Sequence, residues 1–271
     1  MVDGKRPAQA MKNSSMYQLK TTRMKLFSFL LAGFLLCFVP RAFAQEITVV
    51  TEDIAPFIFF DKKEQRVSGS ATEMVVEILK RAKLTHRIEI YPWARSYMLA
   101  QRAPNVAIYS MTRTPEREKM FKWVGAVEQR DPYLFRLKSR PEINAKTFAD
   151  LKPFFIGGIR DDATALYLAK QGLHIDYSSN DAQNLRKLML KRIDALVIDD
   201  QAINYVANVE KIDSTEIERF FKLDELSGPL FLAFSLSTPD DIVMRCKSAL
   251  MAMVQDGTYQ QITQKWNKKA E

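Results

Sequence analysis

The sequence has little cysteine and little histidine, two residues of each among 271. Cys37 falls in a predicted export signal, so Cys246 is the single thiol of the mature chain and no intramolecular disulfide can form. Cys246 lies in an apolar helical pattern, which favours a buried structural thiol over a reactive one. His86 and His174 have no second metal ligand at zinc spacing, and the chain has neither a P-loop nor a G-x-G-x-x-G segment. We therefore expect no metal and no nucleotide cofactor.

No apolar run reaches the roughly 20 residues that a comfortable membrane span needs. The run at residues 26–39 covers 14 residues and is followed by Ala42-Phe43-Ala44, an arrangement typical of a cleaved export signal. We predict cleavage before Gln45 and no stable membrane insertion afterwards; the alternative is an uncleaved N-terminal anchor. Met24 could be the true start, which would make residues 1–23 an overhang.

The mature chain also lacks a strong excess of positive charge. The full sequence has 40 basic and 32 acidic residues, a net charge of +8 that by itself would suggest nucleic acid or an anionic membrane as partner. The predicted signal, residues 1–44, carries seven basic residues and one acidic residue, which leaves 33 against 31 and a net charge of +2. A basic-patch nucleic-acid binder is therefore disfavoured. With 47% apolar residues overall, the chain can bury the core of one large domain or two small ones.

Strand and helix patterns alternate through the first part of the mature chain. Runs rich in β-branched and apolar residues predict strands at 47–51, 86–91 and 106–109. Apolar residues at helical spacing predict helices over 74–82 and 95–99. Such an order implies parallel strands joined by crossover helices, which is an α/β arrangement.

A second unit of the same kind begins after Lys138. We expect strands at 154–157, 173–177, 195–198 and 230–236, and helices at 163–170, 185–193, 202–209, 242–254 and 259–266. Thr238 is expected to cap the helix that follows it, and Gly257 to separate the last two helices.

These elements predict two α/β lobes with a ligand cleft between them. Each lobe would be a mostly parallel sheet flanked by helices. We expect lobe 1 at 45–132, lobe 2 at 133–227, and a return to lobe 1 with the C-terminal helices at 228–271. Two crossover segments, 131–137 and 226–231, would form the hinge. Ligands of open α/β sheets bind at the carboxyl ends of strands, which would face this cleft.

Four segments carry a resemblance to a known family. The strongest is Ser110-Met111-Thr112-Arg113-Thr114-Pro115-Glu116-Arg117, which is similar to a hydroxyl-x-Thr-x-x-Arg segment after the third strand. The others are residues 67–69, 192–199 and 256–266, in the family's order and spacing. The chain thus resembles the family 3 periplasmic solute-binding proteins, which serve polar amino acid uptake and have the type II periplasmic binding fold. The resemblance implies a monomeric periplasmic receptor that captures a small charged metabolite, an amino acid or related carboxylate, by lobe closure for an inner-membrane ABC permease.

The resemblance also implies where the ligand is held. Arg117 matches the position that binds the ligand's α-carboxylate, and its planar guanidinium suits two-pronged binding of an anion. Ser110 and Thr112 would donate to the same group. Asp199 matches the position that receives the α-ammonium, with Asp200 as the alternative if the register slips by one residue. Arg117 could instead pair with a neighbouring glutamate on a solvated helix face.

Trp93 matches an aromatic that stacks on the ligand side chain, or it is a packing tryptophan. Arg95 could be a second anion contact or a surface charge, and Tyr109 is a further candidate for the site. Ile54 stands where many amino acid binders have a second aromatic, so a two-ring sandwich is not expected.

The second lobe departs from the family pattern. Arg160 and Asp161 begin a charged turn in place of the expected small hydroxyl clamp, which is lost or moved to Thr164. An enzyme on the same scaffold, such as a cyclic-acid dehydratase, would need a general acid in the cleft, for which Glu52, Asp53 or Asp161 could serve. No nucleophile–base pair is visible, so we expect a binding protein and not an enzyme. A ligand-sensing module that delivers to a membrane sensor is the other alternative.

Overall fold

The computed structural model describes Met1 and residues 46–270, with side chains described as far as Trp266. The predicted signal, which contains Cys37, lies outside the described residues except for Met1. Residues 44–271 group into one compact unit. Among the described residues, none of the helices has the length and apolar character needed to cross a membrane.

The first sheet holds five strands in the order β4-β1-β5-β12-β6. Their bounds are β1 (Ile47–Thr51), β4 (His86–Ile90), β5 (Val106–Thr112), β6 (Phe121–Arg130) and β12 (Gly228–Ser235). A separate two-stranded sheet comprises β2 (Phe59–Asp61) and β3 (Arg66–Ser68). Around these strands lie α2 (Ser70–Arg81), α3 (Trp93–Arg102), α7 (Asp240–Gln255) and α8 (Thr258–Ala270).

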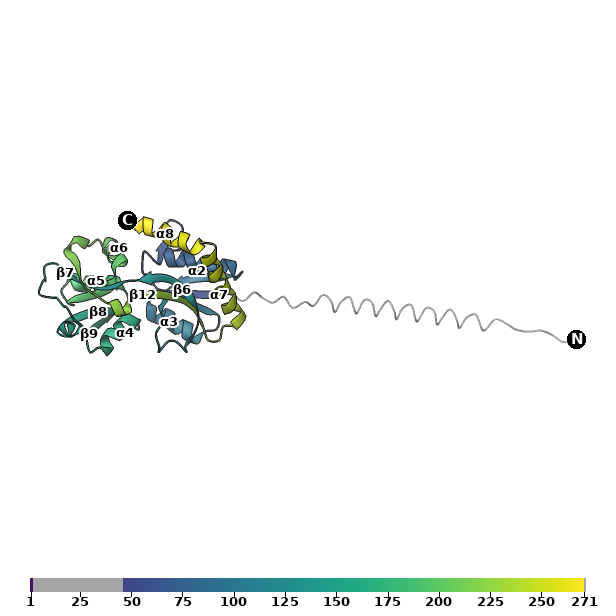
Figure 1. Ribbon diagram of the computed structural model, residues 1–271, viewed down its shortest axis with the longest axis horizontal. Helices are drawn as coiled ribbons and strands as arrows, with labels where there is room; N and C mark the ends of the chain where they lie inside the picture. Colours follow the sequence, from purple (N-terminus) through teal and green to yellow (C-terminus); the bar gives the residue numbers. More distant parts are fainter. Residues whose placement is uncertain (2–45, 271) are drawn as a thin grey trace. The chain divides into compact units, whose positions relative to one another are not determined.

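Alternating side chains of β1 divide the first lobe into two apolar layers. Val49 packs with residues of α2 and α7, whereas Val50 packs with Trp93 and Ala100 of α3. The helices therefore cover both faces of the sheet (Figure 1). This arrangement leaves the carboxyl ends of β1 and β5 free to carry polar side chains.

The second sheet also has five strands, in the order β11-β7-β10-β8-β9. They are β7 (Pro132–Leu137), β8 (Phe155–Ile159), β9 (His174–Ser178), β10 (Ala195–Asp199) and β11 (Ile217–Lys222). The helices are α4 (Ala163–Lys170), α5 (Asp181–Met189) and α6 (Asp200–Glu210), with short 3-10 turns η1 (Phe148–Leu151), η2 (Ser214–Glu216) and η3 (Asp224–Leu226). The α5 and α6 helices pack on one apolar layer and α4 on the other.

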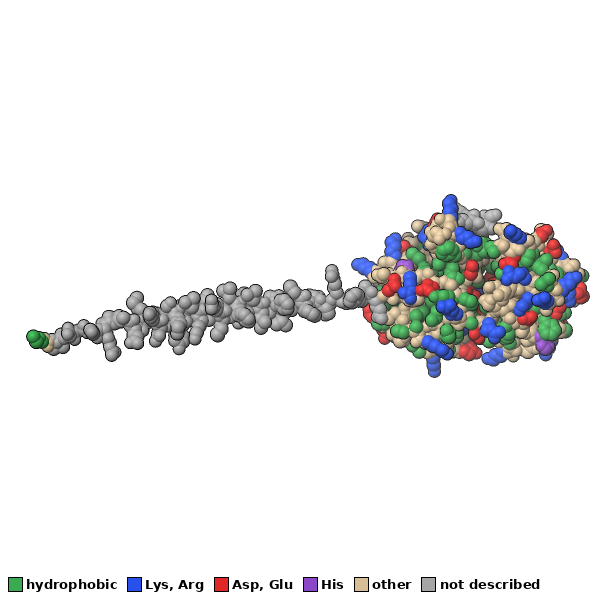
Figure 2. All heavy atoms as spheres, turned by 180° about the vertical axis from the view of Figure 1, so that it is seen from behind, with side chains coloured by type: hydrophobic (Ala, Val, Ile, Leu, Met, Phe, Trp, Pro, Cys, Tyr) green, Lys and Arg blue, Asp and Glu red, His purple; other side chains and the backbone are tan. Residues whose placement is uncertain are grey.

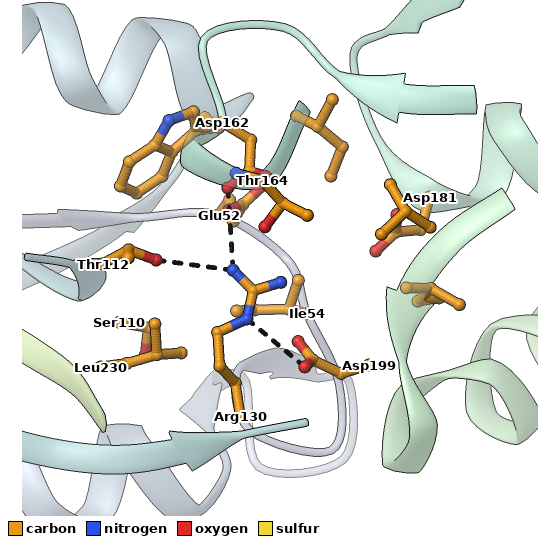
Figure 3. Close-up of a pocket in the computed structure, with 14 residues that line it drawn as sticks. Glu52, Ile54, Ser110, Thr112, Arg130, Asp162, Thr164, Asp181, Asp199 and Leu230 are labelled. Carbon is orange, nitrogen blue, oxygen red and sulfur yellow. Dashed lines mark hydrogen bonds and ion pairs between the residues drawn. The ribbon is translucent and has the colours of Figure 1, made fainter. Parts of the chain in front are cut away.

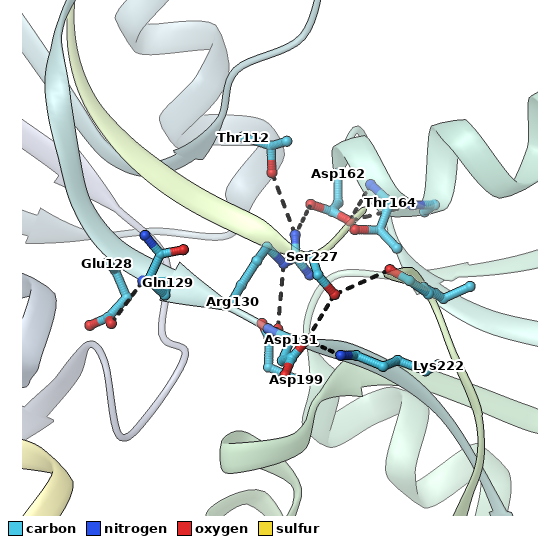
Figure 4. Close-up of polar contacts among 12 residues, drawn as sticks. Thr112, Glu128, Gln129, Arg130, Asp131, Asp162, Thr164, Asp199, Lys222 and Ser227 are labelled. Atoms are coloured by element: carbon cyan, nitrogen blue, oxygen red, sulfur yellow. Dashed lines mark hydrogen bonds and ion pairs between the residues drawn. The ribbon is translucent and has the colours of Figure 1, made fainter. Parts of the chain in front are cut away.

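The chain passes between the two sheets twice. It leaves the first sheet at Asp131, between β6 and β7, and it returns between β11 and β12. The two passages are joined, because Ser227 Oγ donates to Asp131 Oδ1 at 2.8 Å and Lys222 Nζ lies 3.2 Å from the same oxygen (Figure 4). The expected hinge segments overlap these passages, and their role as a hinge stays a prediction.

The predicted α/β class with two sheets is confirmed, but each sheet is mixed, not mostly parallel. Two strand pairings are parallel and two are antiparallel in each sheet. The strands β6, β7 and β11 supply most of the antiparallel pairing, and none of them was predicted.

Two local predictions were wrong. Ile193 does not continue the α5 face, because the helix ends at Met189 and Lys191 turns the chain with a positive φ of 54°. Thr238 does not cap α7, which begins at Asp240 with Pro239 in the N-cap position. The Thr238 hydroxyl lies 2.9 Å from Ser235 Oγ instead.

The surface matches the small net charge of the mature chain. On the face shown in Figure 2, basic and acidic side chains are interspersed over the described residues. No single-sign field therefore points to nucleic acid on this face.

Candidate functional site

A cavity of about 40 Å³ lies between the two lobes. It is lined by Glu52, Ile54, Trp93, Ser110, Thr112, Arg130, Ile159, Asp162, Thr164, Asp181, Val197, Ile198, Asp199 and Leu230. Several of these residues end or directly follow strands β1, β5, β8 and β10, so the strand ends bring them together. A buried water needs roughly 10–15 Å³ of such space, so the closed cavity has room for only a few waters.

Four carboxyl groups face one cation in this cavity (Figure 3). They belong to Glu52, Asp162, Asp181 and Asp199, and the cation is Arg130. Arg130 Nε lies 3.4 Å from Asp199 Oδ1 and Nη1 lies 4.0 Å from Asp162 Oδ2. The side chains of Arg130 and Asp199 are only 12% and 10% exposed, so water screens these charges weakly. The cavity is therefore suited to positive charge.

Burial and mutual repulsion raise the pKa values of three of these carboxyl groups, those of Glu52, Asp181 and Asp199. Burial, and then repulsion from Asp199 and Asp162, raises the pKa of Asp181 to about 8. Burial, with the nearby Asp162 and Asp181, also raises the pKa of Glu52 well above its ordinary value. Burial raises the pKa of Asp199 as well, although Arg130 opposes this shift. A cation that entered the cavity would favour the charged forms and displace protons.

Ser110 is strained and lacks a partner. Its φ is 56°, in the left-handed region that a non-glycine residue seldom adopts. Its hydroxyl is buried and has no hydrogen-bond partner among the described residues, although it lines the cavity. Backbone strain and unsatisfied buried polar atoms both cost free energy, and both are common at ligand-binding sites.

A backbone carbonyl of the second lobe receives two hydrogen bonds from the first. Trp93 Nε1 donates to the Asp161 carbonyl at 2.9 Å, and Arg117 Nη2 donates to the same oxygen at 3.0 Å. Asp161 has a φ of 62°, so this turn is another strained point. These bonds join the two lobes next to the cavity, whose wall includes Trp93 and Asp162.

Arg117 directs its guanidinium to backbone carbonyls, not into the cavity. Besides the Asp161 carbonyl it donates to that of Thr112 at 3.2 Å, and it lies over the rings of Trp93 and Tyr97. Its neighbouring glutamates are engaged elsewhere, with Arg113 and Lys170. With Arg95 it lines a wider groove of about 1300 Å³, which shares Thr112 and Arg130 with the cavity.

The structure brings five of the predicted site residues to the cavity wall. They are Trp93, Ser110, Thr112, Thr164 and Asp199. The alternative to Asp199, Asp200, pairs outside the cavity with Arg219 at 2.8 Å. Of the three acids named for a general acid, Glu52 lines the cavity, whereas Asp53 and Asp161 do not.

Three other predicted residues lie away from the cavity wall. Tyr109 is fully buried in the core, where its hydroxyl lies 2.9 Å from Thr72 Oγ1. Arg95 and Arg160 stack over the rings of Tyr91 and Tyr177.

Sequence reasoning missed three polar residues of the cavity. Asp162 caps α4 by accepting the Thr164 amide at 2.9 Å, and Asp181 begins α5. An acid between a strand and a helix was a signal that could have found both. Arg130 had no such signal, because it reads as an ordinary charge at a strand end.

No metal site is evident in the part of the chain that the structure describes, since no three His, Cys, Asp or Glu residues there gather closely enough to hold an ion. Cys246 is buried and free, and burial raises the pKa of its thiol to about 12.

The sequence matches the bacterial extracellular solute-binding proteins, family 3, over residues 47–269. The chain belongs to this family. Comparison of the family 3 protein with curated proteins gave no match. Its fold is similar to several solved structures, all at low sequence identity.

One similar structure is a histidine kinase sensor domain with similarity to periplasmic binding proteins, at a TM-score of 0.73 and 18% identity, covering 82% of this chain and 96% of that one. Another is an ancestral arginine-binding protein bound to arginine, at a TM-score of 0.70 and 20% identity, covering 82% of this chain and 97% of that one. A third is an ancestral amino acid-binding protein that is a precursor of cyclohexadienyl dehydratase, at a TM-score of 0.66 and 22% identity, covering 82% of this chain and 95% of that one. At these identities the likeness establishes the fold alone.

Proposed function

We propose that this family 3 protein is a periplasmic receptor for a small solute with an excess of positive charge, such as a basic amino acid or a related amine. The excess of buried carboxyl groups over cations in the cavity carries the proposal. An uncompensated buried charge is costly, so a cation that pairs with these groups would bind favourably. The similarity to an arginine-bound ancestral protein is in keeping with this choice.

The solute would be held by lobe closure. Asp199 and Asp162 come from lobe 2, whereas Glu52, Ser110 and Thr112 come from lobe 1, so a ligand that touches both sets favours the closed form. The bonds from Trp93 and Arg117 to the Asp161 carbonyl would form at the same time.

Arg117 is proposed to hold the ligand's anionic group in the wider groove, beside Thr112, which lines both the groove and the cavity. Its guanidinium already lies against the Thr112 carbonyl, at 3.2 Å, and Thr112 itself lines the cavity. Arg117→Lys retains the charge but loses the planar pair of donors. It should therefore weaken the binding of solutes that carry a carboxylate and leave the binding of amines without a carboxylate unchanged. If Arg117→Lys weakened the binding of both kinds of solute equally, Arg117 would not be the residue that binds the ligand's anionic group.

The closed, liganded protein would then deliver its solute to an inner-membrane ABC permease. The similarity to a binding protein of an amino acid ABC transporter favours this receiver, and that to a histidine kinase sensor domain favours a membrane sensor as the second candidate. An enzyme acting on a cyclic acid is disfavoured, because an anionic substrate would meet the carboxyl groups of the cavity.

The test is a thermal-shift screen of residues 45–271 with matched solutes, followed by calorimetry. L-arginine, L-lysine and agmatine should raise the melting temperature, whereas L-glutamate should not. Asp199→Asn should weaken binding of the cationic solutes by about 2–5 kcal/mol, the range for truncating one partner of a buried charge pair. Asp200→Asn is the matched control, because its carboxylate pairs with Arg219 outside the cavity. Tighter binding of L-glutamate than of the basic solutes would overturn the proposal.

A further inference from the structure

Arg130 enters the cavity from the point where the chain leaves the first lobe. It is the last residue of β6, and Asp131 follows it in the passage to β7. Its side chain lies among Asp199, Asp162 and Thr112 (Figures 3 and 4), with Nη1 3.5 Å from Thr112 Oγ1. Strand β6 therefore fixes the main chain of Arg130, and polar groups of both lobes hold its guanidinium.

Arg130 is the one cation among the residues that line the cavity. Two of its partners, Asp199 and Asp162, are acids of lobe 2, so the side chain from β6 links the lobes electrostatically. With Arg130 in this place the cavity measures about 40 Å³, which is enough for a few waters but not for an amino acid. A solute must therefore displace the guanidinium or open the cavity further.

We infer that Arg130 is a specificity-determining residue, a cation of the chain itself that takes the position of the ligand's cationic group while the closed cleft is empty. The inference rests on the proposed function, and it adds a condition on which solutes can bind. A solute binds only if its own cationic group competes with Arg130 for Asp199 and Asp162. Strongly basic, multidentate groups such as a guanidinium meet that condition better than a single ammonium.

The opposite role, in which Arg130 binds the ligand's anionic group, is disfavoured by the same geometry. An anion beside Arg130 would lie among four carboxyl groups. Its attraction to one cation would be opposed by each carboxyl that is ionised.

Removal of the side chain provides the test, because it should leave a vacant cation position. Arg130→Ala is titrated with methylguanidinium chloride, a small probe with the same charged group, and melting is followed with matched sodium chloride as reference. At about five times its Kd the probe should raise the melting temperature of Arg130→Ala by about 2–4 °C. Wild type and Arg130→Lys carry their own cation and should not respond.

Arg140→Ala is the matched control for the loss of an arginine. Arg140 Nη1 lies 2.7 Å from Asp194 Oδ1, a pair that does not line the cavity. An equal response of Arg140→Ala and Arg130→Ala, or no response of Arg130→Ala, would overturn the inference. If Arg130→Ala does not fold, Arg130→Gln, which keeps a polar side chain, replaces it under the same criterion.

Calorimetry with L-arginine and agmatine separates the two roles of Arg130. If Arg130 competes with the ligand, Arg130→Ala should bind both at least as tightly as wild type. A tenfold loss confined to L-arginine would assign Arg130 to the carboxylate and overturn the inference. Because the methylguanidinium test needs no natural solute, a failed solute screen would refute the proposed function without deciding the role of Arg130.

Discussion

Proton release on binding is the most direct consequence of the buried carboxyl groups. With a pKa of about 8, the Asp181 carboxyl is about 90% protonated at pH 7 in the unliganded closed form. L-arginine carries two cationic groups, so it adds positive charge to the cavity even where one of them replaces Arg130. The added charge favours the ionised form of Asp181, and a pKa brought below about 6 would leave the group mostly ionised. Binding at pH 7 should thus release nearly one proton from Asp181, with a further contribution from Glu52.

The sign of the pH dependence follows from this linkage. Asp181 binds its proton more tightly in the folded chain than in the unfolded chain, where its pKa is near 3.9. The free energy of unfolding of the unliganded protein should therefore fall as pH rises from about 4 to about 8. The affinity for a cationic solute should rise over the upper part of the same range, by up to about tenfold per pH unit for one proton released.

Calorimetry in buffers of different ionisation enthalpy counts these protons. Wild type should release about one proton per L-arginine bound at pH 7, and Asp181→Asn should release fewer. Asp200→Asn, altered at a carboxylate outside the cavity, should behave as wild type. The reasoning is refuted if no proton is released, or if affinity falls as pH rises from 6 to 8.

Four further predictions follow from other parts of the chain. Trp93→Phe keeps a ring but loses the donor to the Asp161 carbonyl, so closure should weaken by about 0.5–1.5 kcal/mol; spin-label distances between the lobes measure this, and an unchanged distribution contradicts it. Ser110→Gly should relieve the left-handed strain and raise the free energy of unfolding by about 1 kcal/mol while it lowers ligand affinity; denaturant titration and calorimetry should show opposite signs, and a common sign argues against a ligand role. Cys246 should resist thiol reagents in the folded protein, and rapid labelling without unfolding would be inconsistent with its burial. Mass spectrometry of exported protein should find an N-terminus at Gln45 or within two residues of it, and an intact signal would disprove cleavage.

The fold was largely predictable because its helices and parallel strands have simple periodic patterns. The apolar faces of α2 and α5, and the wholly buried run of β10, are visible as spacing in the sequence. By contrast, β6 has no such signal, because Gly125 and Ala126 interrupt its alternation and its pairing with β12 is irregular. Antiparallel strands that complete a sheet from distant parts of the chain depend on tertiary pairing, which local patterns do not encode.

The site was predictable where a polar residue ends a buried strand. Asp199 was found because it ends an apolar run and matches the family position for the ligand's ammonium group. Thr112, the last residue of β5, was found through the hydroxyl-x-Thr-x-x-Arg segment that resembles the family. Arg130 could not be found in this way. A charge at a strand end usually faces water, whereas Arg130 is buried against Asp199 and Asp162, two acids from a distant part of the chain.

The hydrogen bonds to the Asp161 carbonyl determine which substitutions position 161 tolerates. Two side chains of lobe 1 reach it, Trp93 and Arg117, but the acceptor itself belongs to the backbone. The side chain at position 161 can therefore vary freely in substitution, provided that the residue tolerates a φ near 62°. Glycine or asparagine would retain the contact, whereas valine would remove it by changing the path of the main chain. The joint between the lobes therefore depends on the path of the main chain at Asp161, which a comparison of side-chain motifs alone would not detect.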